Sequence, residues 1–205
     1  MEGAALPGVF AGVSCADYTH AIGLDKIAIW GFNNGCLNKE RKMPEPERTS
    51  AMRLLDSCKI AYRIHTFSSE IHSADQVARI LGFPASQVFK TLVVIPPKGK
   101  PLLAIVPCDG ELDLKKLAQV VDEKKLRMAT KVEAEAITGL LVGGISALSL
   151  MNKGFRIYID ATCRQFPEII VSAGRRGINV QLAPADLIRI IKAQVVDISS
   201  PTSAS

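Results

Sequence analysis

Apolar positions recur along residues 49–199 with two periods, that of helices and that of strands, and no segment is repeated. Helical spacing predicts helices over 49–57, 73–81, 113–121 and 131–137, and Pro184 suits the first turn of a last helix over 185–193. Ser73 and Gln76 have the spacing of a capping box, and Gly82 ends that helix. Alternation predicts a strand over 62–67, and short strand-like runs predict further strands over 89–95, 102–106, 156–159, 169–172 and 180–182. Helices mixed with hairpin-joined strands indicate an α+β fold around a mixed, mainly antiparallel sheet.

One predicted strand carries a charge inside an apolar run. Residues 87–95 read Gln-Val-Phe-Lys-Thr-Leu-Val-Val-Ile, which is apolar on both faces and typical of a strand covered on both sides. A buried ammonium is costly unless a polar or anionic group meets it. Lys90 therefore lies either at the strand end with its head in water or in a functional site. The strand alone favours neither.

Two later segments combine strand-like runs with glycines. Residues 138–148 contain Gly143-Gly144 between apolar residues, and such a loop can present free N–H groups to a phosphate, a carboxylate or an ester carbonyl. A glycine pair by itself is usually a turn. Residues 168–177 end in Ala-Gly-Arg-Arg-Gly, which by itself would be a hairpin with a basic turn.

Taken together in this order, the segments resemble the YbaK family of aminoacyl-tRNA deacylases, relatives of the editing domain of bacterial prolyl-tRNA synthetase. The resemblance covers residues 50–198 and implies a curved mixed sheet ringed by helices. It is carried by these stretches: Ile64-His65-Thr66-Phe67, Lys90-Thr91-Leu92, Glu111–Leu117, Leu141–Ser146, Val171–Gly177 and Leu182–Leu187.

The resemblance implies hydrolysis of the ester between a wrongly attached amino acid and the 3′ adenosine of tRNA. The implied substrate is Cys-tRNA(Pro) or another small amino acid on tRNA(Pro). An aminoacyl ester is already activated, so orientation and oxyanion stabilisation suffice, in keeping with a sequence that has no visible Ser-His-Asp triad. The expected partners are the acceptor end of mischarged tRNA and prolyl-tRNA synthetase. No cofactor is expected, and the expected location is cytoplasmic.

The family template also implies roles for individual residues. Lys90 would hold the terminal phosphate or ribose, or stabilise charge near the ester. The other implied site residues are the loop amides of Gly143, Gly144, Ile145 and Ser146, which would cradle the 3′ end and the carbonyl, and the substrate-contacting Phe67, Thr91, Asp160, Ser172, Gly174 and Asn179. Asp160 follows a predicted strand and could equally be a turn former.

Three positions depart from the family pattern. The glycine loop usually ends Gly-Ile-Ser-Pro, whereas this chain has Ala147 in place of the proline. Phe67 stands where cysteinyl-tRNA deacylases often carry tyrosine, and Asn179 stands where some members carry aspartate. These departures bear on the cysteinyl substrate more than on the deacylase class.

Turn and linker signals separate the first 48 residues from the rest. Residues 1–48 have no sustained period and are expected to be a disordered extension or the product of a misplaced start, with Met43 or Met52 as the initiator. The deacylase domain is expected over 49–199, followed by a disordered tail over 200–205. No stretch has the length of a membrane span.

Composition and charge narrow the function classes. The chain has 205 residues, 48% hydrophobic and 22% charged, with net charge +5, which suits a globular domain with an anionic partner. Five scattered cysteines and three histidines lack metal-ligand spacing, so no metal site is expected. Cys58 and Cys108 are expected to fill the core, and Cys163 to lie in a loop or at a strand end.

Two other functions remain open from the sequence. The chain could be a tRNA-binding adaptor that kept the fold but lost catalysis, for which Ala147 is the best support. It could also hydrolyse a small aminoacyl ester or nucleotide without binding tRNA.

Overall fold

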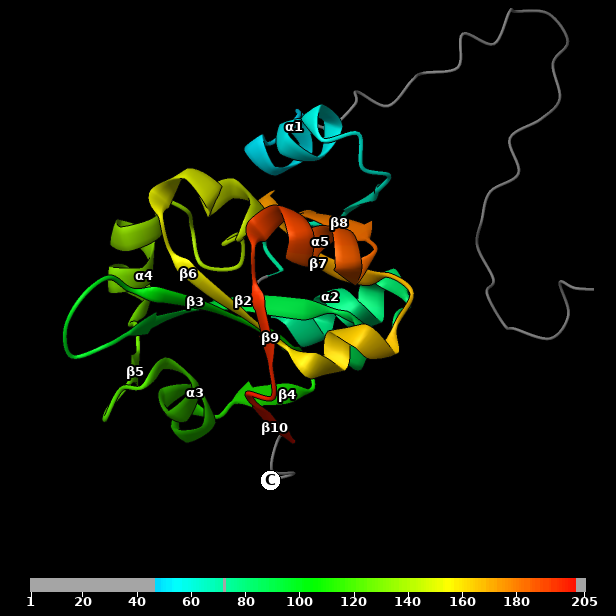
Figure 1. Cartoon of the computed structure of the whole chain (residues 1–205). Coiled ribbons are helices and arrows are strands. Elements are labelled where there is room, and N and C mark those ends of the chain that lie inside the picture. Colours follow the sequence, from blue (N-terminus) through cyan, green and yellow to red (C-terminus); the bar gives the residue numbers. More distant parts are fainter. Residues whose placement is uncertain (1–46, 72, 202–205) are drawn as a thin grey trace, which may run out of the picture. The chain divides into compact units, whose positions relative to one another are not determined.

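The computed structural model describes residues 47–71 and 73–201 (Figure 1). The described part has five α-helices, three short 3-10 segments and ten strands. The helices are α1 (Ser50–Ser57), α2 (Ala74–Leu81), α3 (Leu114–Val121), α4 (Lys131–Thr138) and α5 (Pro184–Ile191). The 3-10 segments are η1 (Ala85–Gln87), η2 (Leu148–Lys153) and η3 (Ala161–Gln165). None of these helices is long and apolar enough to cross a membrane.

The strands form three sheets. A five-stranded mixed sheet has the order β5-β2-β3-β6-β9, in which β3, β6 and β9 run parallel and the other pairs are antiparallel. The antiparallel sheets have the orders β1-β8-β7 and β10-β4. The bounds are β1 (Arg63–Thr66), β2 (Phe89–Ile95), β3 (Leu102–Pro107), β4 (Gly110–Leu112), β5 (Arg127–Met128), β6 (Arg156–Asp160), β7 (Ile169–Arg175), β8 (Ile178–Leu182), β9 (Gln194–Val196) and β10 (Ser199–Pro201).

The five-stranded sheet is covered on both faces, as the apolar run of β2 predicts. Phe89, Val93 and Ile105 face a core shared with α1, η2, α5 and the inner side of β7 and β8. Val94 and Leu102 face a second core with α3. A third, smaller cluster lies under α2. The α+β fold and its mixed sheet are confirmed, with the strands divided among three sheets.

Several details differ from the sequence expectations. Ser73 makes no side-chain cap at α2, and the capping box of the described chain is Thr130 with Glu133 at α4. The box consists of two hydrogen bonds: the Glu133 carboxylate accepts from the Thr130 backbone amide, and the Thr130 hydroxyl accepts from the Glu133 backbone amide. The short strands β4, β5, β9 and β10 were not expected, since two or three residues show no period.

The C-terminal boundary and one thiol also differ. Ser200 and Pro201 belong to β10, paired with Glu111 and Gly110, so the folded region extends past the expected boundary at residue 199. Cys108 is buried as expected, whereas Cys58 is exposed at the end of α1 and is not a core residue. Cys163 is fully buried in η3, just after β6. The expectations for residues 1–46 and 202–205 lie outside the described residues.

Candidate active site

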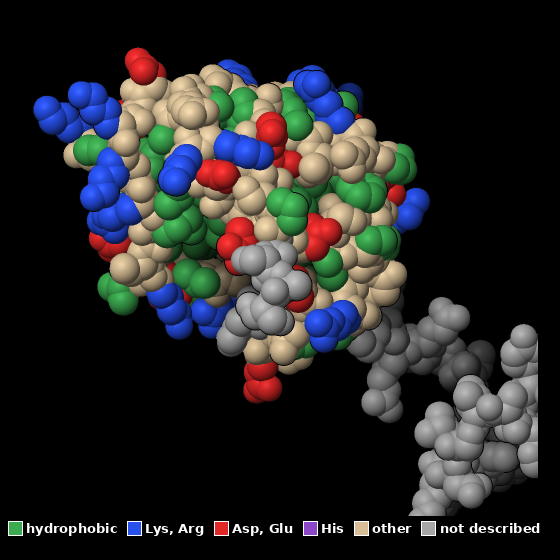
Figure 2. Space-filling view, turned by 90° about the horizontal axis from the view of Figure 1, so that it is seen from below, with side chains coloured by type: hydrophobic (Ala, Val, Ile, Leu, Met, Phe, Trp, Pro, Cys, Tyr) green, Lys and Arg blue, Asp and Glu red, His purple; other side chains and the backbone are tan. Residues whose placement is uncertain are grey.

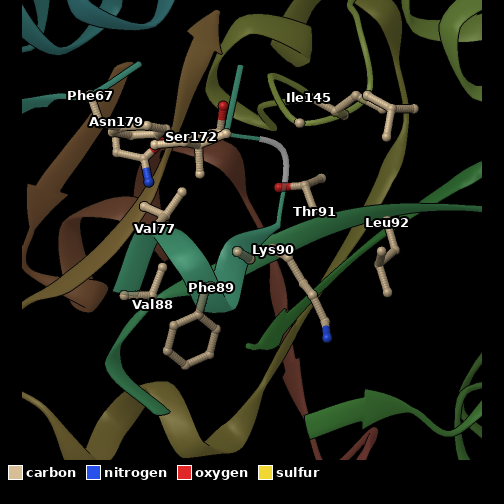
Figure 3. Close-up of a pocket in the computed structure, with 14 residues that line it drawn as sticks. Phe67, Val77, Val88, Phe89, Lys90, Thr91, Leu92, Ile145, Ser172 and Asn179 are labelled. Carbon is tan, nitrogen blue, oxygen red and sulfur yellow. The ribbon is translucent and has the colours of Figure 1, made fainter. Parts of the chain in front are cut away.

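A pocket of about 210 Å³ opens where the three-stranded and five-stranded sheets meet under α2 (Figure 3). The two sheets are joined there by a parallel bridge between Val88 and Ile170. The lining residues come from β2, β7, β8, α2, the chain around Phe67 and the glycine loop. They are Phe67, Ile71, Ala74, Val77, Val88, Phe89, Lys90, Thr91, Leu92, Val142, Gly143, Ile145, Ser172 and Asn179.

Seven of the residues expected in the site line this pocket. They are Phe67, Lys90, Thr91, Gly143, Ile145, Ser172 and Asn179, drawn from four separate parts of the chain. The contributions of α2 and of the start of β2 (Ala74, Val77, Val88 and Phe89) were not assigned to a site from the sequence. Their apolar type predicts burial, and nothing in the sequence separates a pocket wall from a core.

Lys90 is the only charged side chain among the described residues of the lining. Its Nζ donates a hydrogen bond to the carbonyl oxygen of Cys108 at 3.2 Å and is half-buried. Figure 3 shows the side chain directed away from Phe67, Ser172 and Asn179. An ammonium has three donors, so this contact leaves two for a substrate group. Lys90 lines the pocket, and its role in a functional site stays a prediction.

The glycine loop borders the pocket through Gly143 and Ile145 and has backbone donors without a partner in the described chain. Gly143 has φ +92°, a conformation that favours glycine, and Gly144 lies so close to the turn after β7 that a Cβ would meet the Arg176 nitrogen at 2.8 Å. Within the described residues, the amides of Gly143, Ile145 and Ser146 donate no hydrogen bond. The Gly144 amide differs from expectation, because it donates to the Leu141 carbonyl at 2.8 Å and closes the loop's own turn.

A clamp that the sequence did not reveal fixes this loop. The guanidinium of Arg176 donates through Nε to the Val142 carbonyl at 2.7 Å, and the Val142 amide donates to the Glu135 carboxylate at 3.0 Å. Arg176 and Glu135 approach each other to 3.7 Å, both largely buried. The loop is therefore bound on one side to α4 and on the other to the β7–β8 turn.

The wall opposite the loop carries uncharged polar groups. Figure 3 shows Phe67, Ser172 and Asn179 together on one side of the pocket and Ile145 on the other. Asn179 is only 7% exposed, and its side-chain amide has no hydrogen-bond partner among the described residues. The Ser172 hydroxyl accepts from the Gly174 amide at 3.3 Å and keeps its proton available.

The remaining expected site residues lie outside the pocket lining. Ser146 is buried behind the loop, and its hydroxyl has no partner within the described chain. Gly174 lines a neighbouring hollow. Asp160 accepts hydrogen bonds from the backbone amides of Thr162, Ile198 and Ser199. These contacts fit the alternative expectation, in which Asp160 is a structural residue that forms the turn at the strand end.

The Cys108 thiol, close to Lys90, lies outside the pocket lining. Burial raises the pKa of this thiol to about 12, although Lys90 acts in the opposite direction. A raised pKa disfavours the thiolate, which is the form of cysteine that attacks. The polar groups of the lining are Lys90, the hydroxyls of Thr91 and Ser172, the side-chain amide of Asn179 and the backbone of the glycine loop.

Comparison with known proteins agrees with this geometry. A family model described as the aminoacyl-tRNA editing domain matches residues 68–190. An Enterococcus faecalis protein named as a candidate Cys-tRNA(Pro)/Cys-tRNA(Cys) deacylase, EbsC, is 38% identical over 161 residues, 78% of this chain and 98% of that protein. The multifunctional Ser/Thr-tRNA deacylase ProXp-y of Escherichia coli is 27% identical over 139 residues, 66% of this chain and 83% of that protein.

A solved structure has the same fold. A crystal structure described as a candidate trans-editing enzyme for prolyl-tRNA synthetase superposes with a TM-score of 0.64 at 26% identity, covering 74% of this chain and 97% of that one. The family match spans the pocket from the residue after Phe67 to α5. The chain belongs to the aminoacyl-tRNA editing domain family.

Proposed function

We propose that this protein is an aminoacyl-tRNA deacylase that hydrolyses the ester of a small amino acid wrongly attached to tRNA(Pro). The observation that carries the proposal is the juxtaposition of Lys90 with the unused amides of Gly143 and Ile145 around a small pocket with no carboxylate in its described lining. Such a pocket attracts an anion and a developing oxyanion. Family membership supports the same reaction.

The ester is cleaved by attack of water on its carbonyl carbon. The carbonyl oxygen gains negative charge, which the loop amides stabilise, and the water gives up a proton. The bond to the ribose oxygen then breaks, that oxygen takes up a proton, and the amino acid and tRNA are released. Lys90 holds a phosphate or ribose oxygen of the 3′ adenosine through its two remaining donors. A single pre-placed donor to an oxyanion contributes about 10²–10³-fold in rate, so two amides are enough for an activated ester.

The pocket admits a small aminoacyl group. Its volume is about 210 Å³, which is small for a ligand pocket. The walls offer Thr91, Ser172 and the neutral amide of Asn179 as hydrogen-bonding groups. A side chain with one hydroxyl or thiol therefore fits better than a large apolar one. The relatives named for cysteinyl and for seryl or threonyl substrates support this class.

The test is single-turnover deacylation of tRNA(Pro) charged separately with cysteine, alanine, serine or proline. We expect the full chain to release at least one of the first three and to spare proline, and Lys90→Ala to lower that rate about 10²-fold. Lys98→Ala is the matched control, since Lys98 is exposed in the loop that follows the same strand. It should leave the rate unchanged.

Two outcomes would replace the proposal. If no species is released while the chain still binds tRNA, the protein is a tRNA-binding adaptor. If aminoacyl-adenosine is hydrolysed equally well with or without the tRNA body, the protein is a small-ester hydrolase. Prolyl-tRNA synthetase is the proposed partner, and co-sedimentation of the two proteins with tRNA(Pro) tests it.

A further inference from the structure

A second hollow, of about 260 Å³, adjoins the end of β7, the strand that also supplies Ser172 to the active pocket. Its charged lining consists of Arg48, Arg53 and Arg175 together with a single carboxylate, Glu47. We call it the arginine hollow. It lies at the start of α1, near the top of Figure 1.

The arginine hollow and the active pocket share a wall. Ser172 of β7 lines the pocket, and Gly174, two residues later on the same strand, lines the hollow. The glycine loop is in contact with the same segment, because a Cβ on Gly144 would lie 3.0 Å from the carbonyl carbon of Arg175. A chain that leaves the pocket past the glycine loop therefore reaches these arginines next.

The arginines of the hollow make exposed, exchangeable contacts, and two of the three already pair with carboxylates: Arg48 with Asp56, and Arg175 with Glu47. Arg175 pairs with Glu47 at 2.8 Å, with side chains 57% and 78% exposed. Arg53 donates to the backbone carbonyl of Arg48 at 2.9 Å and meets no carboxylate among the described residues. Exposed ion pairs contribute little to stability, so an incoming anion can replace Glu47 at small cost.

We propose that the arginine hollow binds backbone phosphates of the tRNA 3′ strand, next to the nucleotide whose ester is in the pocket. This inference rests on the proposed deacylase function. A guanidinium offers two parallel donors to one phosphate. A hollow lined by arginines is therefore better suited to bind phosphates than one lined by lysines. Figure 2 shows the molecule from below, where carboxylates lie among the lysines and arginines except along one edge, where basic side chains gather.

The test separates binding of the tRNA body from the chemistry. The full chain, Arg53→Gln, Arg175→Gln and their double variant are compared on aminoacyl-tRNA and on the corresponding 3′-aminoacyl-adenosine, which lacks the neighbouring phosphates. We expect each single variant to raise KM for aminoacyl-tRNA about tenfold, with kcat and the turnover of aminoacyl-adenosine unchanged. The dependence of log KM on log salt concentration should become shallower by about one unit per arginine.

Two further variants make the result specific. The double variant Lys115→Gln/Lys124→Gln removes the same amount of charge from exposed sites at α3 and its following loop, on the opposite side of the molecule in Figure 1, and should leave KM unchanged. Glu47→Gln removes the carboxylate that competes with phosphate and should lower KM for aminoacyl-tRNA about threefold. Circular dichroism melting confirms that every variant is folded.

The failures can be told apart. If the unmodified chain releases no amino acid from any tRNA, the proposed function fails, and this inference fails with it. If the unmodified chain is active but the arginine variants keep its KM and salt dependence, only the inference is overturned. The same holds if the arginine and lysine variants raise KM equally, because the effect is then one of net charge.

Discussion

At Ala147, where the family loop usually has proline, the backbone already has the geometry that proline imposes. Its φ is −61°, and its amide donates no hydrogen bond to any described residue. Proline at such a site stabilises by about 0.4–1 kcal/mol, because it restricts the unfolded chain. We expect Ala147→Pro to raise the melting temperature by about 1–4 °C and to leave deacylation at least as fast.

Calorimetry and the single-turnover assay decide this. A lower melting temperature would mean that the buried surroundings of Ala147 do not admit the proline ring. A variant that becomes active from an inactive parent would instead identify the native chain as an adaptor whose loop had lost catalysis.

Two routes lead from the sequence to residues that line the pocket: a break in a pattern, and the family resemblance, which implied Phe67, Thr91, Ser172 and Asn179. Lys90 stands in an apolar strand, and Gly143-Gly144 interrupts an apolar run, so both were recognised and both line or form the pocket. Arg176 and Glu135 are separated by 41 positions in the sequence. No local pattern in the sequence predicts that these two charged side chains lie close together. Asp160 was assigned to the site by family analogy, and its bonds to the C-terminal backbone show a structural position.

At the scale of elements, the glycine loop depends on two neighbours for its shape. Arg176 at the β7–β8 turn donates to the Val142 carbonyl, and Glu135 on α4 accepts from the Val142 amide. The five helices of eight residues and the strands of four to seven residues agree with the sequence expectations, because their apolar patterns are long enough to be recognised. The edge strands β4, β5, β9 and β10 have two or three residues each, and they exist because neighbouring strands offer partners.

The clamp predicts an effect on rate without direct contact with substrate. In Arg176→Met the Val142 carbonyl loses its donor, and the loop amides lose their fixed direction, so kcat should fall about tenfold while KM changes less than twofold. Arg176→Lys should recover part of the rate, since one donor returns. Single-turnover and steady-state assays are the measurement, with melting curves to show that the fold is kept.

Two other results would show that the contacts of Arg176 and Glu135 with Val142 do not affect the catalytic rate. If Arg176→Met raises KM for aminoacyl-tRNA but not for aminoacyl-adenosine, Arg176 acts as a phosphate contact and belongs with the arginine hollow. If neither kinetic constant changes, the loop keeps its shape without the clamp.

For the whole molecule, Asp160 ties the central sheet to the end of the described chain. Its carboxylate, only 1% exposed at the end of β6, accepts the amides of Ile198 and Ser199 beside β10, as well as the Thr162 amide and hydroxyl. Burial would raise the pKa of this carboxyl, but the hydrogen bonds outweigh burial and hold the pKa below its usual value. The charged form is therefore the stable one in the folded protein.

This linkage predicts an acid-dependent loss of stability. A depressed pKa adds stability that is complete above the ordinary carboxyl pKa of about 3.9 and is lost as pH falls through the folded value. Asp160→Asn should lower the free energy of unfolding by about 1.5–3 kcal/mol at pH 7, and by less as pH falls below about 4. Urea unfolding at several pH values measures this. A constant difference across that range would contradict the assignment.

The active pocket lies between two sheets that share one backbone bridge, Val88 with Ile170. Lys90 and Thr91 belong to one sheet, and Ser172 and Asn179 to the other. A substitution on one wall leaves the hydrogen-bond ladder of the opposite wall intact. The lineage can therefore change the size and polarity of the amino acid it accepts by small independent steps, without refolding the scaffold. Relatives whose names give cysteine and serine or threonine are consistent with such a history.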